Sequence, residues 1–348
     1  MTNAQIFRTR EGGKIDREVK ISFIFNGKKY YGYKGDTLAS ALLANGIHLI
    51  GRSFKYHRPR GIIAAGVEDA NGKVQLSRNN ISEPNVNITE VELVEGLSFE
   101  SQNCWPSVTF DIWAINNFLN RFFPAGFYYK TFMGPHKKFW LKIYEPLIRR
   151  AAGLGKPPKE FKALSSHLYH NVDIVIVGGG LNGLLAAKSL INSKLEVLLI
   201  EFDSNLGGII NNSSKINKID DKEPQEWLKN TIQEIEDSKT IKILTNILVS
   251  TYNYINHLIA VEDKYVGSRP SNNEVNSTLH KIRADHVILS NGHIERFLSF
   301  QNNDKPGIML ASSFEKYICR YGALPNNCLL YTSPSPRDAT LSRMPSSA

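Results

Sequence analysis

Hydrophobic and polar positions alternate near the start of the chain. Ile21, Phe23 and Phe25 recur at every second position, which is the period of a strand with one buried face. Asn26-Gly27 follows directly and is typical of a two-residue hairpin turn. Residues 30–33 then return as the second strand of the predicted hairpin.

A short apolar segment over residues 38–44 predicts a helix, with Asp36 or Thr37 as its N-cap. Residues 86–93 predict a later strand. A hairpin followed by a helix is typical of the β-grasp, ferredoxin-like architecture. We therefore expect such a domain over residues 1–103.

Residues 104–168 form an aromatic-rich segment that predicts short helices. Core packing between domains is the default interpretation, and aromatic anchors also favour a subunit interface. We treat 104–168 as a helical connector, with residues 153–158 as a linker. The aromatic residues of this segment include Trp105, Trp113, Phe122, Phe123, Phe127, Tyr128, Tyr129, Phe132, Phe139, Trp140 and Tyr144.

A different hydrophobic pattern begins near residue 169. Residues 173–177 are an apolar, β-branched run, the composition of a strand buried on both faces. Gly178, Gly180 and Gly183 follow with G-x-G-x-x-G spacing and lead into an apolar helix. A second buried strand over 197–200 ends in Glu201. This order predicts a Rossmann-like FAD/NAD(P)-binding domain over residues 169–328.

Each residue type suits a dinucleotide. The glycines permit a tight turn, close approach of a pyrophosphate and close packing of helix on strand. The helix N-terminus presents N–H groups to the phosphates. Glu201 can accept hydrogen bonds from the ribose hydroxyls and would repel a 2′-phosphate. NAD is therefore expected, with FAD as the alternative at the same site, and NADP is disfavoured.

Two later features extend this prediction. Gly207-Gly208 lies just after Glu201, where many flavoproteins with two dinucleotide domains carry a glycine pair. A strand over residues 284–289 leads to Gly292 and is expected to return to the nucleotide site. A helix beginning near Pro224 and short strands over 241–244, 248–252, 258–261 and 278–282 predict a β-meander inserted between the halves of this domain.

The net charge of +9 arises entirely before residue 169. Within that half, the loop 51–61 carries four basic candidates for a phosphate site or an acidic partner: Arg52, Lys55, Arg58 and Arg60. A solvated basic loop is the alternative interpretation. No nucleic-acid motif is visible, so we expect no nucleic-acid partner.

The chain has three cysteines, Cys104, Cys319 and Cys328. They are too few and too scattered for a disulfide framework, and the loop 51–61 has none, so we expect no iron–sulfur cluster. The histidines and acids show no metal-ligand spacing, and no general base or nucleophile can be named. No apolar run approaches a membrane span and no signal segment is visible, which predicts a cytoplasmic protein.

Residues 329–348 have a biased composition rich in Ser, Pro and Arg, without hydrophobic periodicity. They are interpreted as a non-native tail. The nucleotide-binding domain is therefore expected to be incomplete.

At this point the chain is identified as similar to the α subunits of heterotetrameric sarcosine oxidases. The similarity lies in six segments that together span nearly all of residues 10–325. They are residues 35–62, 102–107, 125–133, 144–155, 173–183 and 302–325.

The resemblance implies a cluster-less ferredoxin-like domain fused to a two-dinucleotide-domain oxidoreductase unit. It implies NAD at the glycine fingerprint and an FMN shared with a β subunit. In the family, sarcosine is demethylated to glycine at an FAD on β, electrons pass through FMN to oxygen to give hydrogen peroxide, and tetrahydrofolate captures the one-carbon unit as 5,10-methylenetetrahydrofolate. The implied partners are β, γ and δ subunits.

The resemblance also implies a C-terminal folate-binding domain, which we expect to be missing from this sequence. The fragment alone is therefore expected to be inactive. Two alternatives remain open. The chain could be the α subunit of a related opine, proline or amino-acid dehydrogenase. It could also be a non-catalytic assembly subunit whose nucleotide is structural.

Overall fold

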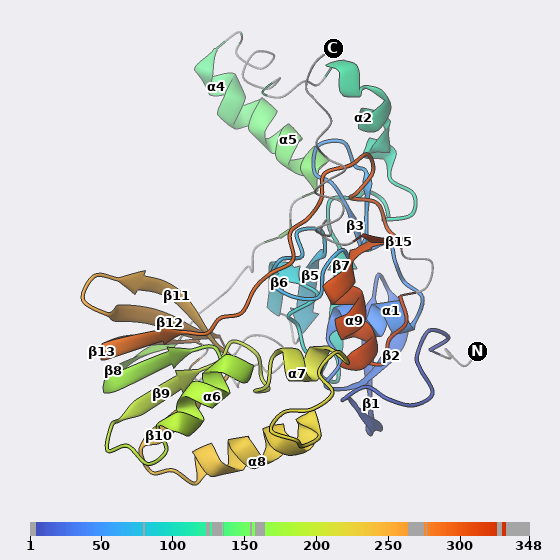
Figure 1. Ribbon diagram of the computed structural model, residues 1–348. Coiled ribbons are helices and arrows are strands. Elements are labelled where there is room, and N and C mark those ends of the chain that lie inside the picture. The colour runs from blue at the N-terminus through green and yellow to red at the C-terminus, as the bar shows by residue number, and fades with distance from the viewer. Residues whose placement is uncertain are drawn as a thin grey trace, which may run out of the picture. The chain divides into compact units, whose positions relative to one another are not determined.

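The computed structural model describes residues 5–78, 81–122, 126, 134, 136–153, 155–156, 164–263, 275, 277–325 and 329–331. The contacts divide the chain into two compact units, which are described separately. Unit 1 comprises Met1–Glu160 and Glu295–Ala348, and unit 2 comprises Phe161–Ile294. Figure 1 labels their helices and strands.

Unit 1 contains a mixed five-stranded sheet with the order β2-β1-β7-β5-β6. β1 and β2 form the predicted antiparallel hairpin, and Asn26 and Gly27 have the positive φ angles of its turn (50° and 75°). β7 runs parallel to β1 and antiparallel to β5. The strands are β1 Asp16–Phe25, β2 Lys28–Lys34, β5 Lys73–Arg78, β6 Ile81–Asn87 and β7 Leu97–Ser101.

The predicted helix is α1, Leu38–Ala44, and every residue in it is buried. Thr37 is its N-cap and forms a capping box with Ser40, which satisfies two backbone donors at the first turn. α1 packs on Phe23, Phe99 and other apolar residues of the sheet. The expected ferredoxin-like arrangement of hairpin, helix and sheet is therefore present.

The strand expected over residues 86–93 is wrong in its extent. β6 ends at Asn87, and Ile88, Val91 and Leu93 are buried in the core outside any strand. Their apolar character reflects burial under a turn rather than a half-buried strand. A short hairpin, β3 Gly51–Arg52 and β4 Pro59–Arg60, closes the basic loop.

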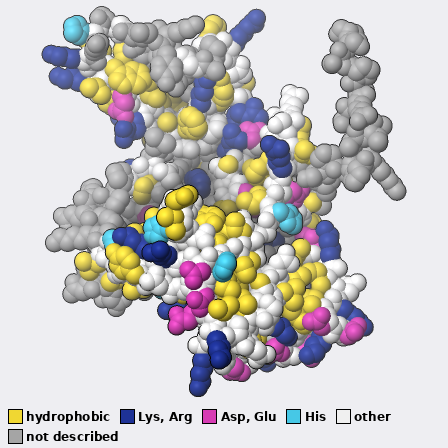
Figure 2. Space-filling model, turned by 60° about the vertical axis from the view of Figure 1, so that its left-hand side comes forward, with side chains coloured by type: hydrophobic (Ala, Val, Ile, Leu, Met, Phe, Trp, Pro, Cys, Tyr) yellow, Lys and Arg dark blue, Asp and Glu magenta, His cyan; other side chains and the backbone are white. Residues whose placement is uncertain are grey.

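The segment after β7 forms the expected short helices. They are η1 Ile112–Ala114, α2 Ile115–Phe118, η2 Asn120–Phe122, α4 Lys137–Phe139, η3 Trp140–Tyr144 and α5 Glu145–Ala152. Many of their large apolar side chains are exposed, Phe118 by 85% and Leu141 by 73%. Figure 2 shows hydrophobic side chains beside basic ones on the part at the top of the view. The Phe118 and Leu141 side chains are not packed in the core of unit 1, and the expected packing between domains stays a prediction.

Residues 308–323 belong to unit 1, although we expected them in the nucleotide-binding domain 169–328. β14, Ile308–Leu310, leads into α9, Ala311–Cys319. Met309, Tyr317 and Tyr321 are buried in the same core as the ferredoxin-like sheet. Sequence periodicity identifies a buried helix face, but it does not identify the sheet that buries it. The domain boundary expected at 328 is therefore corrected: unit 2 ends at Ile294.

Unit 2 is built on one six-stranded sheet with the order β10-β9-β8-β13-β12-β11. β10, β9, β8 and β13 are parallel to one another, as expected for a Rossmann-like domain. β12 pairs antiparallel with β13, and β11 pairs antiparallel with β12. The strands are β8 Ser165–Val177, β9 Val197–Ile200, β10 Ile241–Leu244, β11 Ile247–Asn253, β12 His257–Asp263 and β13 Ser277–Leu289.

The helices of unit 2 are α6 Leu181–Ser189, α7 Ile209–Asn212 and α8 Pro224–Glu236. α6 and α8 cover one face of the sheet (Figure 1), where Leu184, Trp227 and Leu228 pack on Ile176 and Leu199. Val175, Leu258 and Ile282 belong to the core on the opposite face.

Two strand predictions in this unit need correction. The strands expected over 278–282 and 284–289 are one continuous strand, β13, so the meander is an extension of the parallel sheet rather than a separate insertion. β8 begins at Ser165 and therefore includes residues expected in the connector. The tail 329–348 lies outside the described residues except for β15, Leu329–Tyr331, whose backbone pairs with β14.

Candidate nucleotide-binding site

The glycine fingerprint occupies the turn between β8 and α6, at the carboxyl end of the parallel strands. Gly178 has a φ of 105°, a backbone conformation that residues other than glycine rarely adopt. A Cβ at Gly178 would overlap the backbone of Ser290, which follows β13. The Ser290 N–H donates to the Val177 carbonyl at 2.7 Å, so the two strand ends are joined here.

Gly183 lies in the first turn of α6. A Cβ at this position would overlap the Gly178 carbonyl oxygen. Glycine is therefore required for the helix to approach the strand, as the fingerprint predicts.

Gly180 is different because protein packing does not require it to be glycine. It is the N-cap of α6 with a φ of −74°, and the nearest described atom to a Cβ there is the Gly208 Cα at 4.0 Å. A Cβ at Gly180 would therefore have room, and no side chain caps the helix N-terminus. Open space at this glycine fits the close approach of a pyrophosphate to the backbone.

Glu201 directs its carboxylate at the fingerprint loop. Oε2 accepts a hydrogen bond from the Gly179 N–H at 2.5 Å, and Oε1 accepts one from the Asp203 N–H at 2.8 Å. The residue is half-buried at the end of β9. Its position beside the loop matches the role expected for a ribose-binding acid.

The glycine pair Gly207-Gly208 packs directly on the fingerprint. The Gly207 N–H donates to the Gly179 carbonyl at 2.9 Å, and a Cβ at Gly208 would come within 3.1 Å of the Gly180 Cα. Both glycines have positive φ angles, 117° and 50°. The structure therefore joins Gly178, Gly180, Gly183, Glu201 and this pair in one site.

Sequence reasoning missed Asn211, which supports the glycine pair from α7. Its buried Nδ2 donates to the Leu206 carbonyl at 2.6 Å, and a Cβ at Gly207 would come within 2.8 Å of that nitrogen. No sequence signal marks this asparagine. Gly292, by contrast, has no described atom within 4 Å of a Cβ, and Ser290 rather than Gly292 contacts the loop.

The four basic candidates of loop 51–61 do not converge on one point. The Arg52 guanidinium donates to three backbone carbonyls, those of Val108 at 2.9 Å, His57 at 3.0 Å and Thr109 at 3.5 Å. The Lys55 Nζ lies 4.8 Å from the centre of the Tyr56 ring. Arg52 therefore has a positioning role within the loop.

Arg58 and Arg60 do come together, around the carboxylate of Asp304. Arg58 donates through Nε at 3.0 Å and Nη2 at 2.7 Å, and Arg60 Nη1 lies 2.8 Å from Oδ2. Burial opposes ionisation of Asp304, but the two guanidinium groups outweigh it and lower the pKa of its carboxyl. Burial lowers the pKa of Arg60, and Asp304 partly offsets this. Two positive charges thus share one negative charge.

The ferredoxin-like domain does not have the ligands of an iron–sulfur cluster. A [2Fe–2S] cluster needs four cysteines, or two cysteines and two histidines. Cys104 is the only cysteine among residues 1–318. Among the described residues, no group of three or more potential ligands could hold a metal ion. The residues of the ferredoxin-like domain therefore do not fit the ligand set of an iron–sulfur cluster.

Two sequence families match parts of the chain. Residues 18–104 match a family described as a 2Fe-2S iron-sulfur cluster binding domain. Residues 176–228 match a family described as an NAD(P)-binding Rossmann-like domain, and this range contains the fingerprint and Glu201. None of the helices in the described part of the chain is long and apolar enough to cross a membrane.

The chain is also similar to individual proteins. It is 41% identical over 326 residues to the sarcosine oxidase subunit alpha of Rhizobium meliloti (strain 1021), a match that covers 92% of this chain and 32% of the relative. It is 27% identical over 317 residues to that of Corynebacterium sp. (strain U-96), covering 89% and 28%.

Among solved structures, L-proline dehydrogenase from P. horikoshii has the same fold. It superposes with a TM-score of 0.58 at 19% identity, over 91% of this chain and 49% of that one. The curated relatives thus match nearly all of this chain, which spans about a third of their length. The chain is a homologue of the sarcosine oxidase alpha subunits.

Proposed function

We propose that this chain is the nucleotide-binding part of the alpha subunit of a sarcosine oxidase, a flavin-dependent oxidoreductase. Its role is to hold NAD at the fingerprint of unit 2, with FAD as the alternative occupant. The observation that carries this proposal is the contact between Glu201 and the Gly179 N–H beside an open Gly180. The whole enzyme would convert sarcosine to glycine with its partner subunits.

The roles of the site residues follow from their positions. The first N–H groups of α6 bind the diphosphate, and Gly180 leaves room for it. The Glu201 carboxylate accepts hydrogen bonds from the ribose hydroxyls and rejects a 2′-phosphate by charge repulsion. A bound dinucleotide supplies two-electron redox capacity. Among the described residues we assign no proton-transfer role.

We further propose that unit 1 holds no iron–sulfur cluster and contributes to an FMN site shared with a β subunit. Of the four basic candidates, Arg58 and Arg60 are the pair that can share an anion, because both guanidinium groups already converge on Asp304. Measuring FMN in the reconstituted complex tests this. Unchanged FMN content in Arg58→Ala and Arg60→Ala would remove these residues from the site.

The central test is nucleotide binding by the purified chain. Calorimetric titration should give NAD affinity at least tenfold above NADP affinity. Glu201→Gln should weaken NAD binding by about ten- to hundredfold, because a hydrogen bond to a charged group contributes about 1.5–3 kcal/mol. Glu196→Gln changes an exposed carboxylate just before the same strand and is the matched control. No binding of NAD or FAD by the folded chain would refute the proposal.

The second candidate function is that of an alpha subunit of a related dehydrogenase. The observation behind it is that the fold of L-proline dehydrogenase extends over 91% of this chain. Activity of the complete complex distinguishes the two. Sarcosine-dependent hydrogen peroxide formation supports the first candidate, and proline or opine oxidation without oxygen consumption supports the second. A complex that oxidises none of these would favour a non-catalytic assembly subunit.

A further inference from the structure

The loop that connects β3 to β4 is closed by its own backbone. The Ser53 N–H donates to the Arg58 carbonyl at 2.9 Å, and the His57 N–H donates to the Ser53 carbonyl at 2.9 Å. The Arg58 N–H donates to the Ser53 Oγ at 3.0 Å. The loop therefore has a defined conformation, although it belongs to a domain whose matching family is described as cluster-binding.

A buried pair joins this loop to the segment after β7. His57 Nδ1 lies 2.6 Å from Asp111 Oδ2, and the two side chains are 1% and 0% exposed. An ionised carboxylate can only accept, so with Asp111 ionised the Nδ1–H tautomer of His57 would donate this bond. Asp111 Oδ1 accepts from the N–H groups of Trp105 at 3.0 Å and Trp113 at 3.2 Å.

Two costs at His57 indicate that this contact contributes strongly. His57 has a φ of 53°, in the left-handed region that side chains seldom adopt. Its Nε2 is buried and has no hydrogen-bond partner among the described residues, which is unfavourable. The bond to Asp111 is a described side-chain contact that can offset both costs. Arg52 adds two hydrogen bonds that connect the loop to the Val108 and Thr109 carbonyls, and a third to the His57 carbonyl within the loop.

We propose that the His57–Asp111 pair, supported by Arg52, is a clasp that holds the loop 51–61 in place without an iron–sulfur cluster. In a cluster-binding domain, metal ligation would fix such a loop. Here the buried contact between His57 and Asp111 and the hydrogen bonds to backbone carbonyls do so. This inference rests on the proposed absence of a cluster. It names the residues that hold the loop where metal ligation would otherwise do so.

Limited trypsin digestion of the full chain tests the clasp, because Lys55 lies inside the loop. Asp111→Asn keeps the size of the side chain and the Oδ1 acceptor but removes the charge that holds His57. Cleavage after Lys55 should become at least tenfold faster in this variant and in His57→Gln. The double variant should be little faster than either single one, because both remove the same contact.

His48→Gln is the control, since His48 is half-buried but lies outside the loop. Cleavage after Lys55 should stay at the wild-type rate in this variant. NAD binding in unit 2 should be unchanged in all of these variants. If Asp111→Asn and His57→Gln are cleaved at the wild-type rate, the clasp is refuted. That result would not bear on the proposed nucleotide site in unit 2.

Iron content separates this outcome from the failure of the underlying proposal. Chain produced in iron-replete and in iron-depleted cells should contain less than 0.1 iron per chain, a bound set at about a twentieth of the occupancy that a two-iron cluster requires. Both preparations should be cleaved at the same rate. About two irons and two sulfides per chain would overturn the absence of a cluster and the clasp together.

Hydrogen exchange of the wild type provides a measurement that needs no variant. The amides of His57 and Arg58 should exchange at least a hundredfold more slowly than in an unstructured peptide, with no iron bound. Exchange at the unstructured rate would overturn the clasp even if the variants failed to fold.

Discussion

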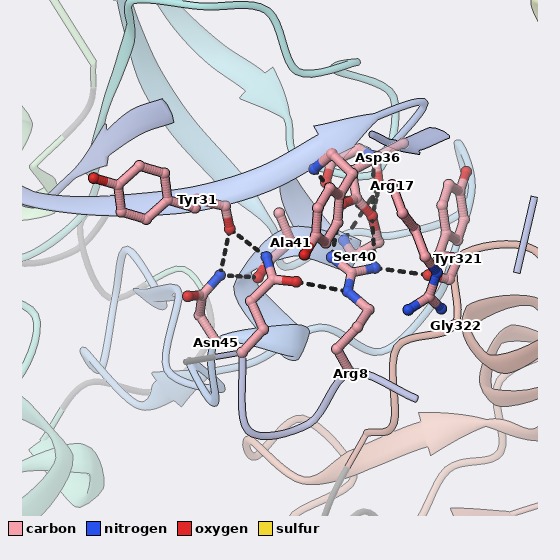
Figure 3. A network of polar contacts seen from close by, with 12 residues as sticks. Arg8, Arg17, Tyr31, Asp36, Ser40, Ala41, Asn45, Tyr321 and Gly322 are labelled. Atoms are coloured by element: carbon pink, nitrogen blue, oxygen red, sulfur yellow. Dashed lines mark hydrogen bonds and ion pairs between the residues drawn. The ribbon is translucent and has the colours of Figure 1, made fainter. Parts of the chain in front are cut away.

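Arg8 and Asp36 form a buried ion pair with two parallel hydrogen bonds in unit 1. Arg8 Nη1 lies 3.0 Å from Oδ1 and Nη2 lies 2.6 Å from Oδ2, and the side chains are 5% and 0% exposed. Arg8 Nη1 also donates to the Tyr321 carbonyl at 2.6 Å (Figure 3). Asp36 accepts further from the Ser40 hydroxyl at 2.6 Å and the Tyr33 N–H at 2.9 Å. The pair therefore connects the N-terminal segment and the end of α9 to the start of α1.

Removing one partner of this pair should destabilise unit 1 strongly. Arg8→Ala leaves the Asp36 carboxylate buried without its counter-charge, which costs about 3–5 kcal/mol. Denaturant unfolding monitored by hydrogen exchange of the α1 amides measures this loss in the stability of unit 1. Arg10→Ala alters an exposed arginine two residues away and should change stability by less than about 0.5 kcal/mol. Equal effects of the two substitutions would contradict this role for Arg8.

Gly180→Ala and Gly183→Ala should separate nucleotide binding from folding. The nearest described atom to a Cβ at Gly180 is 4.0 Å away, so alanine there should cost less than about 1 kcal/mol of stability. It should nevertheless weaken NAD binding at least tenfold, because the methyl group would project into the space proposed for the pyrophosphate. Calorimetry and thermal unfolding of the same samples measure both quantities.

Gly183→Ala has the opposite pattern, because its Cβ would overlap the Gly178 carbonyl. We expect a loss of about 3 kcal/mol or more in the stability of unit 2, since the helix must move away from the strand. If Gly180→Ala bound NAD as tightly as the wild type, the pyrophosphate would not lie above this residue.

Local features of the fold could be predicted from the sequence because their determinants lie close together in the chain. The fingerprint glycines, the strand before them and Glu201 lie within 29 residues, and each has its own steric or electrostatic reason. The hairpin turn at Asn26-Gly27 and the capping of α1 by Thr37 are equally local.

Long-range partners could not be predicted in this way. The Arg58 and Arg60 side chains bind Asp304, which lies more than 240 positions later in the sequence. α9 packs in the ferredoxin-like core rather than on the nucleotide-binding sheet, which is nearer in sequence. Hydrophobic periodicity indicates that Tyr317 is buried, but many apolar surfaces could accept it. Asn211 was missed for a related reason. Its side chain donates to the Leu206 carbonyl, and only the folded turn brings that carbonyl within reach.

Cys104 should be an unreactive thiol in the folded chain. Burial, with a smaller contribution from Asp111, raises the pKa of Cys104 to about 11. At pH 8 the thiolate fraction is then on the order of one in a thousand, so reaction with a disulfide reagent should be about a hundredfold slower than for a free thiol. The measurement uses Cys319→Ser/Cys328→Ser, in which Cys104 alone remains. Native and urea-unfolded samples that react at the same rate would contradict this prediction.

His170 should make unit 2 sensitive to acid. Burial, then the neighbouring His280 and Lys242, lower the pKa of His170. Its Nε2 lies 3.0 Å from His280 Nδ1. Below the unfolded-state value of about 6.5 the unfolded chain takes up a proton that the folded chain resists, so stability falls as the pH drops through this range. His170→Gln should reduce this pH slope, measured by hydrogen exchange in β8 and β13. His167→Gln changes an exposed histidine on the same strand and should leave the slope intact. An identical loss of slope in both variants would show that the effect does not come from the buried contact with His280.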